Sequence, residues 1–225
     1  MTNPDDHEQG HQHGHGHDHD HDHDRTFQPD IEDSPFSHYQ VMAEALGELL
    51  LEKGVFTADD LRAQIEYLDS RSPAVGADVI ARAWTDPDFK AKLMEDVNAA
   101  TEAVGIDAGD IPIRAVENTP DTHNVIVCTL CSCYPRGLLG PPPDWYKSRA
   151  YRSRTVREPR AVLSEFGTTL PEDMEVRVHD STADLRYLVL PMRPAGTDGM
   201  DESDLAKLVT RDCLIGVSLP KSPEA

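Results

Sequence analysis

The sequence predicts an α+β fold, in which an N-terminal helical arm precedes a mixed α/β domain of layered helices and sheets. Apolar residues recur at helical spacing through residues 36–106, whereas β-branched runs alternate with short helical stretches through residues 107–221. Residues 1–35 contain almost no apolar side chains, although 38% of the whole chain is hydrophobic. We therefore expect three segments: a tail, a helical arm and an α/β domain.

The tail, residues 1–35, is rich in histidine and aspartate. Histidine alternates with Asp, Gly and Gln across residues 7–24. Such a segment cannot bury a core, so we expect it to be disordered. Imidazole and carboxylate groups bind Co²⁺, Ni²⁺ or Zn²⁺ loosely, which leaves a metal-gathering role open beside a solubilising one. The tail also lacks the apolar h-region of a signal peptide.

Four helices are expected in the arm, because apolar side chains repeat on one face of each. Thr57 and Asp60 have the spacing of a capping box, and Asp86-Pro87 supplies an N-cap and a proline at the first helical position. We expect this arm to pack on itself or on a partner. The predicted helices run from Val41 to Gly54, from Thr57 to Leu68, from Val75 to Trp84 and from Pro87 to Gly105.

Strands and helices mix in the second half without a regular βαβ order. Short β-branched or alternating runs predict strands, and the stretches between them have helical periodicity. The predicted strands cover residues 124–130, 174–180, 185–191 and 213–220, and the predicted helices lie near residues 145–151, 159–166 and 202–209.

The net charge of −20 narrows the classes of partner. An acidic surface repels phosphate backbones, so nucleic-acid binding is not expected. No run of about 18 apolar residues predicts a membrane span. Basic residues gather in residues 147–160, as either an interface or a solvated helix face. Because the chain has only four cysteines, three of them clustered, a disulfide framework is not indicated and we expect a cytoplasmic, reducing setting.

Cys128, Cys131 and Cys133 lie within six positions, directly after a predicted strand. A structural zinc site needs four ligands in a tetrahedron, and His123 or Cys213 would have to complete it. Iron–sulfur clusters also use four cysteines, usually at wider spacing. Both kinds of site stay open on this pattern, whereas three unliganded thiols this close together would oxidise.

The C-x-C spacing favours a different arrangement. If the sulfur atoms of Cys131 and Cys133 bind one metal, the backbone nitrogens of Ser132 and Cys133 lie between them and can close small chelate rings. The result is a square of two nitrogens and two sulfurs, to which Cys128 can add an axial sulfur. Such a field suits a transition metal, and anionic amides and thiolates favour a trivalent ion that acts as a Lewis acid. A sixth position is left for water or substrate.

The motif VIVCTLCSCYP resembles the metal-binding motif of the nitrile hydratase α subunit of the cobalt type. A close relative with the same motif is the thiocyanate hydrolase γ subunit. The resemblance covers about residues 38–220. It is carried by the further stretches ARAWTDPDFKAKLMED, VENTPDTHN, LGPPPDWYKSRAYRSRTVREPRAVLSEFG, YLVLPMRPAGTDG and LVTRDCLIGV.

The resemblance implies that residues 107–221 form a metal-binding catalytic domain, which hydrates a nitrile to an amide at one non-corrin Co(III) ion per chain. The implied metal ligands are Cys128, Cys131, Ser132 and Cys133, the last three also being the implied catalytic residues. Cys131 would be oxidised to sulfinic acid and Cys133 to sulfenic acid. Either the metal activates water or the sulfenate oxygen of Cys133 attacks the nitrile carbon.

The resemblance also implies the metal type and the partners. Thr129 and Tyr134 are typical of cobalt members rather than iron members of the family. The family works as a heterodimer or heterotetramer with a β subunit, whose arginines hold the oxidised sulfurs. A cobalt-delivering activator is a further expected partner, and the substrate is a small nitrile. The basic stretch 147–160 and the helical arm would then be mainly interface and core.

Two residues depart from the usual hydratase pattern. Arg136 stands where the family commonly has tryptophan, and His179 stands where it often has an aromatic residue. A charge in place of an aromatic pocket wall would suit an anion, so thiocyanate hydrolysis to carbonyl sulfide and ammonia is the alternative reaction. The alternative outside enzymology is a metal-handling protein that works through its His-rich tail.

Four further residues are expected around the metal or in its pocket: Tyr134, Arg136, Asp180 and Arg186. Asp180 and Arg186 match family positions near the active site and would orient the cysteine loop. The alternative for these two is a buried ion pair at the strand ends. The alternative for Tyr134 is simple aromatic packing.

Overall fold

The computed structural model describes residues 37–223, and the predicted His/Asp-rich tail lies outside the described residues. The chain mixes helices with two small sheets, as the sequence predicts, and no described helix has the length and apolarity that a membrane crossing requires. The helices are α1 (His38–Glu52), α2 (Ala58–Ser70), α3 (Pro73–Thr85), α4 (Pro87–Glu95), α5 (Val97–Glu102), α6 (Arg136–Leu139), α7 (Asp144–Lys147), α8 (Arg149–Thr155), α9 (Pro159–Glu165), α10 (Glu202–Ala206) and α11 (Arg211–Ile215). The strands are β1 (Ile113–Glu117), β2 (Thr122–Val127), β3 (Glu175–Asp180) and β4 (Arg186–Leu190).

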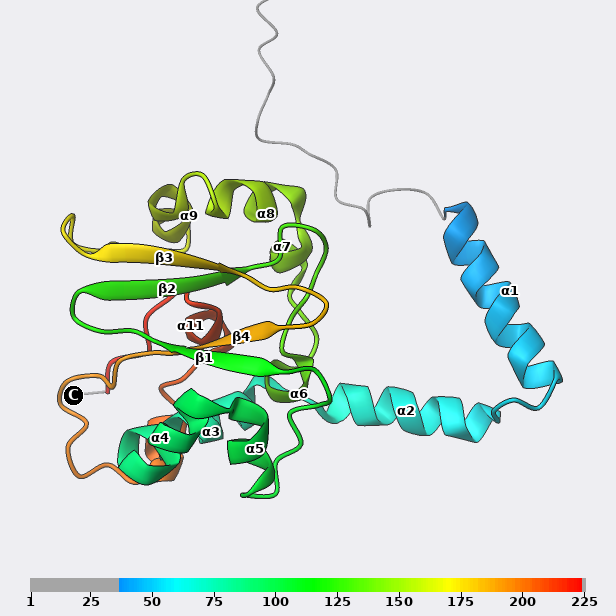
Figure 1. Cartoon of the computed structure of the whole chain (residues 1–225), viewed down its shortest axis with the longest axis horizontal. Helices are drawn as coiled ribbons and strands as arrows, with labels where there is room; N and C mark the ends of the chain where they lie inside the picture. Colours follow the sequence, from blue (N-terminus) through cyan, green and yellow to red (C-terminus); the bar gives the residue numbers. More distant parts are fainter. Residues whose placement is uncertain (1–36, 224–225) are drawn as a thin grey trace, which may run out of the picture.

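The four strands form two parallel pairs, β1 with β4 and β2 with β3. Helices α8 and α9 lie beyond β3, and α3, α4 and α5 lie on the opposite side, next to β1 (Figure 1). Val127 and Asp180 are partners at the carboxyl ends of β2 and β3. Because parallel strands end at the same edge of a sheet, the loop that follows β2 starts beside the last residue of β3.

Helices α1 and α2 project from the rest of the described chain (Figure 1), and neither has a buried residue. Their apolar side chains therefore face solvent instead of packing against each other. Helices α3, α4 and α5 differ, because they contribute buried side chains to the same core as the strands. The boundary at residue 106 between arm and catalytic domain stays a prediction, and the hydrophobic core extends across it.

Most of the predicted helix ends are confirmed, including the capping box of Thr57 and Asp60 and the N-cap at Asp86. The prediction of a single helix from Pro87 to Gly105 is wrong, because the helix is interrupted at Asp96 and two helices, α4 and α5, form instead. This residue has an extended backbone (φ −152°, ψ 109°), and its side chain accepts a hydrogen bond from the Ala99 amide to begin α5. An aspartate inside a helical run is a usable N-cap signal.

The strand predicted over residues 213–220 is also wrong. Thr210 and Cys213 form a capping box that opens α11, and Gly216 ends this helix in the left-handed region. A short apolar run does not distinguish a buried helix from a strand, which explains the error. Neither β1 nor α6 was predicted from the sequence. The strand predicted over residues 124–130 corresponds to β2, which begins at Thr122 and ends at Val127.

Gly216 anchors α11 against β2, and its replacement by alanine should destabilise the fold. Its φ of 91° is unfavourable for other residues, and an added Cβ would lie 2.0 Å from the Asn124 carbonyl oxygen. We expect G216A to lower the free energy of unfolding by about 3 kcal/mol. Gly199 has a φ of 79° with nothing within 4 Å, so G199A is the matched control and should cost only about 1 kcal/mol. Equal losses in urea titrations would contradict the close contact.

Candidate metal centre

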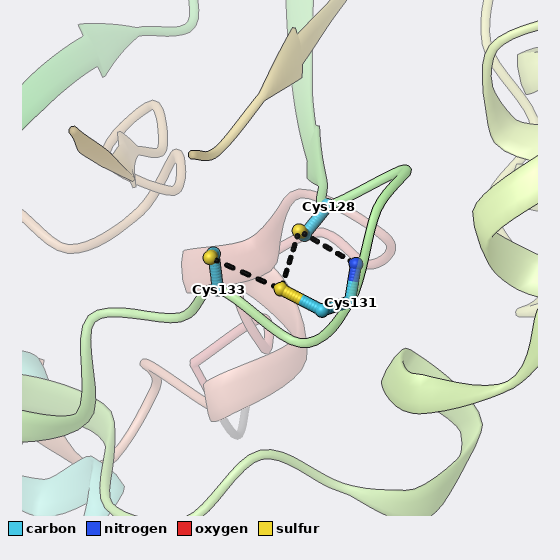
Figure 2. A group of neighbouring side chains, drawn as sticks. All are labelled: Cys128, Cys131 and Cys133. Atoms are coloured by element: carbon cyan, nitrogen blue, oxygen red, sulfur yellow. Dashed lines mark hydrogen bonds between the residues drawn. The ribbon is translucent and has the colours of Figure 1, made fainter. Parts of the chain in front are cut away.

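Three sulfur atoms converge in the loop that follows β2 (Figure 2). The Sγ atom of Cys131 lies 3.6 Å from that of Cys128 and 3.3 Å from that of Cys133. All three atoms lie within 4.8 Å of one another, which is close enough for one metal ion. Cys128 and Cys133 are buried and Cys131 is exposed, so the cluster is open on one side.

The backbone of this loop also turns toward the sulfur atoms. The pKa of Cys131 is lowered first by a hydrogen bond from the Cys133 thiol, then by the Cys128 thiol and the backbone amides of Ser132 and Cys133. Burial raises the pKa of Cys133 to about 12, and the positive charge of Arg186 opposes that shift. The Cys131 amide donates to the Cys128 Sγ atom at 3.3 Å (Figure 2), so backbone nitrogen as well as sulfur faces the centre of the loop.

This donor set fits a transition metal held by thiolates and amide nitrogens. It does not fit a tetrahedral zinc site completed by His123 or Cys213, because neither joins the cluster. His123 Nε2 bonds the Gly216 carbonyl at 2.7 Å, and Cys213 bonds the Thr210 carbonyl at 3.0 Å from within α11. Among the described residues, the three clustered cysteines are the group of potential metal ligands that lie close enough together to hold one ion. Their role as ligands stays a prediction.

Asp180 holds the outer side of the loop. Its Oδ1 atom accepts a hydrogen bond from the Thr129 amide at 2.9 Å, and its Oδ2 atom accepts one from the Thr129 hydroxyl at 2.5 Å. Asp180 therefore fixes the residue that follows Cys128. The alternative of an ion pair between Asp180 and Arg186 is wrong, since Asp180 is engaged by Thr129, and Nη1 of Arg186 is buried without a hydrogen-bond partner in the described chain.

Two buried tyrosines hold the cysteine loop and the strand that precedes it, and neither contact was predicted from the sequence. The Tyr146 hydroxyl donates to the Cys133 carbonyl at 2.9 Å, and the Tyr151 hydroxyl donates to the Ile126 carbonyl at 2.7 Å. They come from α7 and α8; Tyr151 lies within the basic stretch 147–160, and Tyr146 lies just before it. Tyr134 packs edge-on against Tyr146 at 5.1 Å between ring centroids. The sequence predicts a helix near residues 145–151 but carries no signal for these two hydrogen bonds.

A cavity of about 410 Å³ opens onto the cysteine loop. Cys131, Ser132 and Cys133 form one side of it. The rest of its wall is made by residues 108–111 and Ile113, by Tyr134, Arg136 and Gly137, and by Arg186. Two arginines, Arg136 and Arg186, thus line the cavity together with Cys131 and Cys133.

The sequence predicts that a charged residue replaces an aromatic one in the pocket wall. Of the two residues named for this, only Arg136 lines the cavity. His179 does not line the cavity; its Nε2 atom bonds Asn124 Oδ1 at 2.8 Å, and its ring stacks beside Tyr187. Burial, with a smaller effect of Arg177, lowers the pKa of His179 and favours its neutral form. His179 therefore adds no positive charge to the cavity wall.

Comparisons with known proteins agree on one family. A family model described as nitrile hydratase, alpha chain, matches residues 37–218. The γ subunit of thiocyanate hydrolase from Thiobacillus thioparus is 45% identical over 197 residues, which cover 82% of this chain and 81% of that protein. The α subunit of the low-molecular weight cobalt-containing nitrile hydratase from Rhodococcus rhodochrous is 47% identical over 194 residues, covering 84% and 93%.

A solved structure extends the similarity to the fold. A double mutant of the Fe-type nitrile hydratase from Comamonas testosteroni Ni1 superposes with a TM-score of 0.75 at 44% sequence identity. The alignment covers 84% of this chain and 94% of that one. The chain is therefore similar both to nitrile hydratases, of the cobalt and the iron type, and to a thiocyanate hydrolase.

Proposed function

Because the chain belongs to the nitrile hydratase α-chain family, we propose that it is the metal-bearing subunit of a nitrile hydratase, a hydro-lyase that converts a nitrile to its amide. The convergence of three cysteine sulfurs in the loop after β2 carries this proposal. The metal ligands are Cys128 and Cys131 through sulfur, Ser132 through nitrogen, and Cys133 through both.

The metal is a single non-corrin Co(III) ion. Cobalt is favoured by Thr129, by Tyr134 and by the cobalt named in the Rhodococcus relative, whereas the iron-type structural neighbour supports iron as the less favoured choice. When bound, such an ion would supply Lewis acidity toward a nitrile or water in the cavity. Cys131 carries a sulfinate and Cys133 a sulfenate, so oxidised sulfur beside the metal completes the site.

The chain's own residues define where a substrate meets this centre. The exposed Cys131 and the half-buried Ser132 face the cavity, which admits a small molecule, while the buried Cys128 closes the opposite side. Arg186 brings positive charge to Cys133. The positive charge of Arg186 would stabilise the negative charge of an oxidised Cys133 sulfur group.

The partner is a β subunit, in a heterodimer or heterotetramer, and a cobalt-delivering activator loads the metal. Unpaired apolar surface supports a partner of this kind. Leu130, at the tip of the cysteine loop, is 82% exposed, and Tyr39, Met42 and Leu46 on α1 are more than half exposed. Surfaces of this character mark protein–protein contacts. A β subunit seated on them would cover the loop and the arm together.

Thiocyanate hydrolysis is the second candidate function, and the position of Arg136 favours it. The Arg136 side chain lines the cavity with Arg186 and the cysteine loop, so an anion would meet two positive charges. The thiocyanate hydrolase relative supports the same alternative. The reaction would release carbonyl sulfide and ammonia.

Substrate assays of the purified complex test the proposal. We expect acrylonitrile or benzonitrile to be converted to the amide by the chain co-expressed with its partner subunit in cobalt-supplemented medium. Thiocyanate turnover without amide formation would establish the second candidate instead. Absence of both activities in a complex with full cobalt content would overturn the assignment.

Replacing Arg136 separates anion binding from nitrile binding. We expect R136Q to raise the KM or inhibition constant of thiocyanate at least about tenfold, because a charged contact in the cavity is lost. Hydration of neutral acrylonitrile should stay within about threefold, since no charge on that substrate is left unpaired. Arg177 is paired with Glu175 on β3 outside the cavity, so R177Q is the control. Equal effects of R136Q on both ligands would contradict the role of the charge.

A further inference from the structure

One wall of the metal cavity is formed by residues 107–113, which end the connection between α5 and β1 and include the first residue of β1; we call them the wall loop. Residues 108–111 and Ile113 line the cavity directly. The loop folds on itself at its start, where the Gly109 amide donates to Asp107 Oδ1 at 2.8 Å. Its far end is fixed by β4, because the Arg186 amide donates to the Pro112 carbonyl at 2.9 Å.

Arg71, at the carboxyl end of α2, fastens the wall loop to the helical arm. Its Nη2 atom bonds Asp107 Oδ2 at 2.7 Å, and its Nη1 atom bonds the Asp107 carbonyl at 2.8 Å. Tyr67 donates to the same carboxylate, and the guanidinium lies 4.4 Å from the centre of the Tyr67 ring. The Arg71 side chain is only 15% exposed, although α2 itself has no buried residue.

Asn98 of α5 holds the same loop from the other side. Its Nδ2 atom donates to the Gly109 carbonyl at 2.7 Å and to the Ile111 carbonyl at 3.1 Å, and its Oδ1 atom accepts from the Ile113 amide at 2.8 Å. The wall loop is therefore held between α5, which belongs to the core, through Asn98, and the projecting helix α2, through Arg71.

Close backbone packing extends this connection to α6, which carries Arg136. A Cβ added at Gly137 would lie 2.2 Å from the Ala108 carbonyl oxygen, and one added at Gly140 would lie 2.4 Å from the Arg71 carbonyl oxygen. The end of α2, the wall loop and α6 thus touch through main chain. A displacement of one cannot be absorbed by side-chain rearrangement, since tightly packed groups transmit strain.

We propose that Arg71 is a positioning residue that couples α1 and α2, the projecting part of the helical arm, to the wall of the metal cavity. The role of the arm as a seat for the partner subunit rests on the proposed function, and the coupling through Arg71 rests on the contacts above. A partner bound to α1 and α2 then sets the position of residues 108–113 beside the cysteine loop. Substrate binding in the cavity becomes sensitive to what the arm contacts.

Amide hydrogen exchange on the full chain, purified with its partner, tests the coupling independently of any substrate. We expect R71Q to speed exchange about tenfold both in residues 106–113 and at the end of α2, because both lose their fastening. N98A should speed exchange in residues 106–113 without affecting α2. Arg62 forms an exposed pair with Asp59 on α2, so R62Q removes an arginine from the same arm and should change neither segment.

The exchange results decide the proposal. Wild-type exchange of residues 106–113 in R71Q would overturn it, as would equal acceleration in R62Q. If R71Q fails to assemble, R71K keeps the charge but not the two-pronged donation, and it should produce a smaller acceleration confined to the same two segments. Acceleration spread over the whole chain in R71K would show a merely structural role and also overturn the coupling.

Kinetics supply a second readout once a substrate is known. We expect R71Q to raise KM about three- to tenfold with kcat within about twofold, since the cavity wall is displaced while the metal loop is intact. A residue that only stabilises the fold would lower the active fraction, so kcat would fall at constant KM. An inactive wild type would count against the proposed function and leave the exchange test of Arg71 valid.

Discussion

Replacing Cys133 by serine is expected to abolish both metal binding and turnover. Cys133 is one of the two buried members of the sulfur cluster and, in our proposal, binds through sulfur and nitrogen and carries the sulfenate. A serine hydroxyl is a poor ligand for a soft, thiolate-favouring site. We expect cobalt content below about a tenth of the wild-type value and activity lower by at least about a thousandfold, because the reacting centre is lost with its ligand.

Cys213 offers the matched control for this substitution. It is buried in α11, outside the cluster, and its thiol bonds the Thr210 carbonyl. C213S should retain wild-type cobalt content and activity per folded chain. Metal analysis and circular dichroism of both variants, purified as complexes, separate loss of a ligand from loss of fold. Full cobalt occupancy in C133S, or equal loss in C213S, would contradict the assignment of the cluster.

The second large effect is expected at Asp180, whose two carboxylate oxygens hold Thr129 beside Cys128. D180A removes both hydrogen bonds and leaves the loop free to move away from the metal position. Groups that orient metal ligands typically contribute 10- to 100-fold to metal affinity or activity, so we expect D180A to lower cobalt retention about tenfold or more. Cobalt retention in D180N should lie between that of the wild type and that of D180A, because the asparagine amide keeps one oxygen acceptor and loses the other.

Competition with a chelator measures this loss of retention. Asp173 is exposed just before the opposite end of β3, so D173A is a control for removing a carboxylate near the same strand. We expect cobalt to leave D180A about tenfold faster than the wild type and to leave D173A at the wild-type rate. Wild-type retention in D180A, with Thr129 still ordered in a crystal structure, would show that the carboxylate does not position the loop.

The spacing of Cys128, Cys131 and Cys133 was enough to predict their convergence. Three sulfurs that follow the end of a strand within six residues have little room to separate, so local geometry decides their arrangement. The position of Asp180 is different, because it depends on β2 and β3 pairing in parallel with Val127 opposite Asp180. A sequence pattern predicts each strand but not which strands pair.

The cavity wall could not be predicted for a related reason. Residues 108–113 and Arg136 are distant in sequence, and they meet only because α6 packs against the wall loop through Gly137. The polar residues that fasten this wall, Arg71 and Asn98, lie in segments whose periodicity marked them as ordinary surface. The helix α11 was missed because a short apolar run fits both a strand and a buried helix. The capping pair Thr210 and Cys213 was its readable signal.

Metal analysis with intact and peptide mass spectrometry of the purified complex tests the central claim most directly. We predict about one cobalt per chain, as expected for a single tetragonal site. The peptide that contains Cys131 and Cys133 should gain about three oxygen atoms, two for a sulfinic and one for a sulfenic acid. Zinc bound by unmodified thiols in this loop would contradict the account.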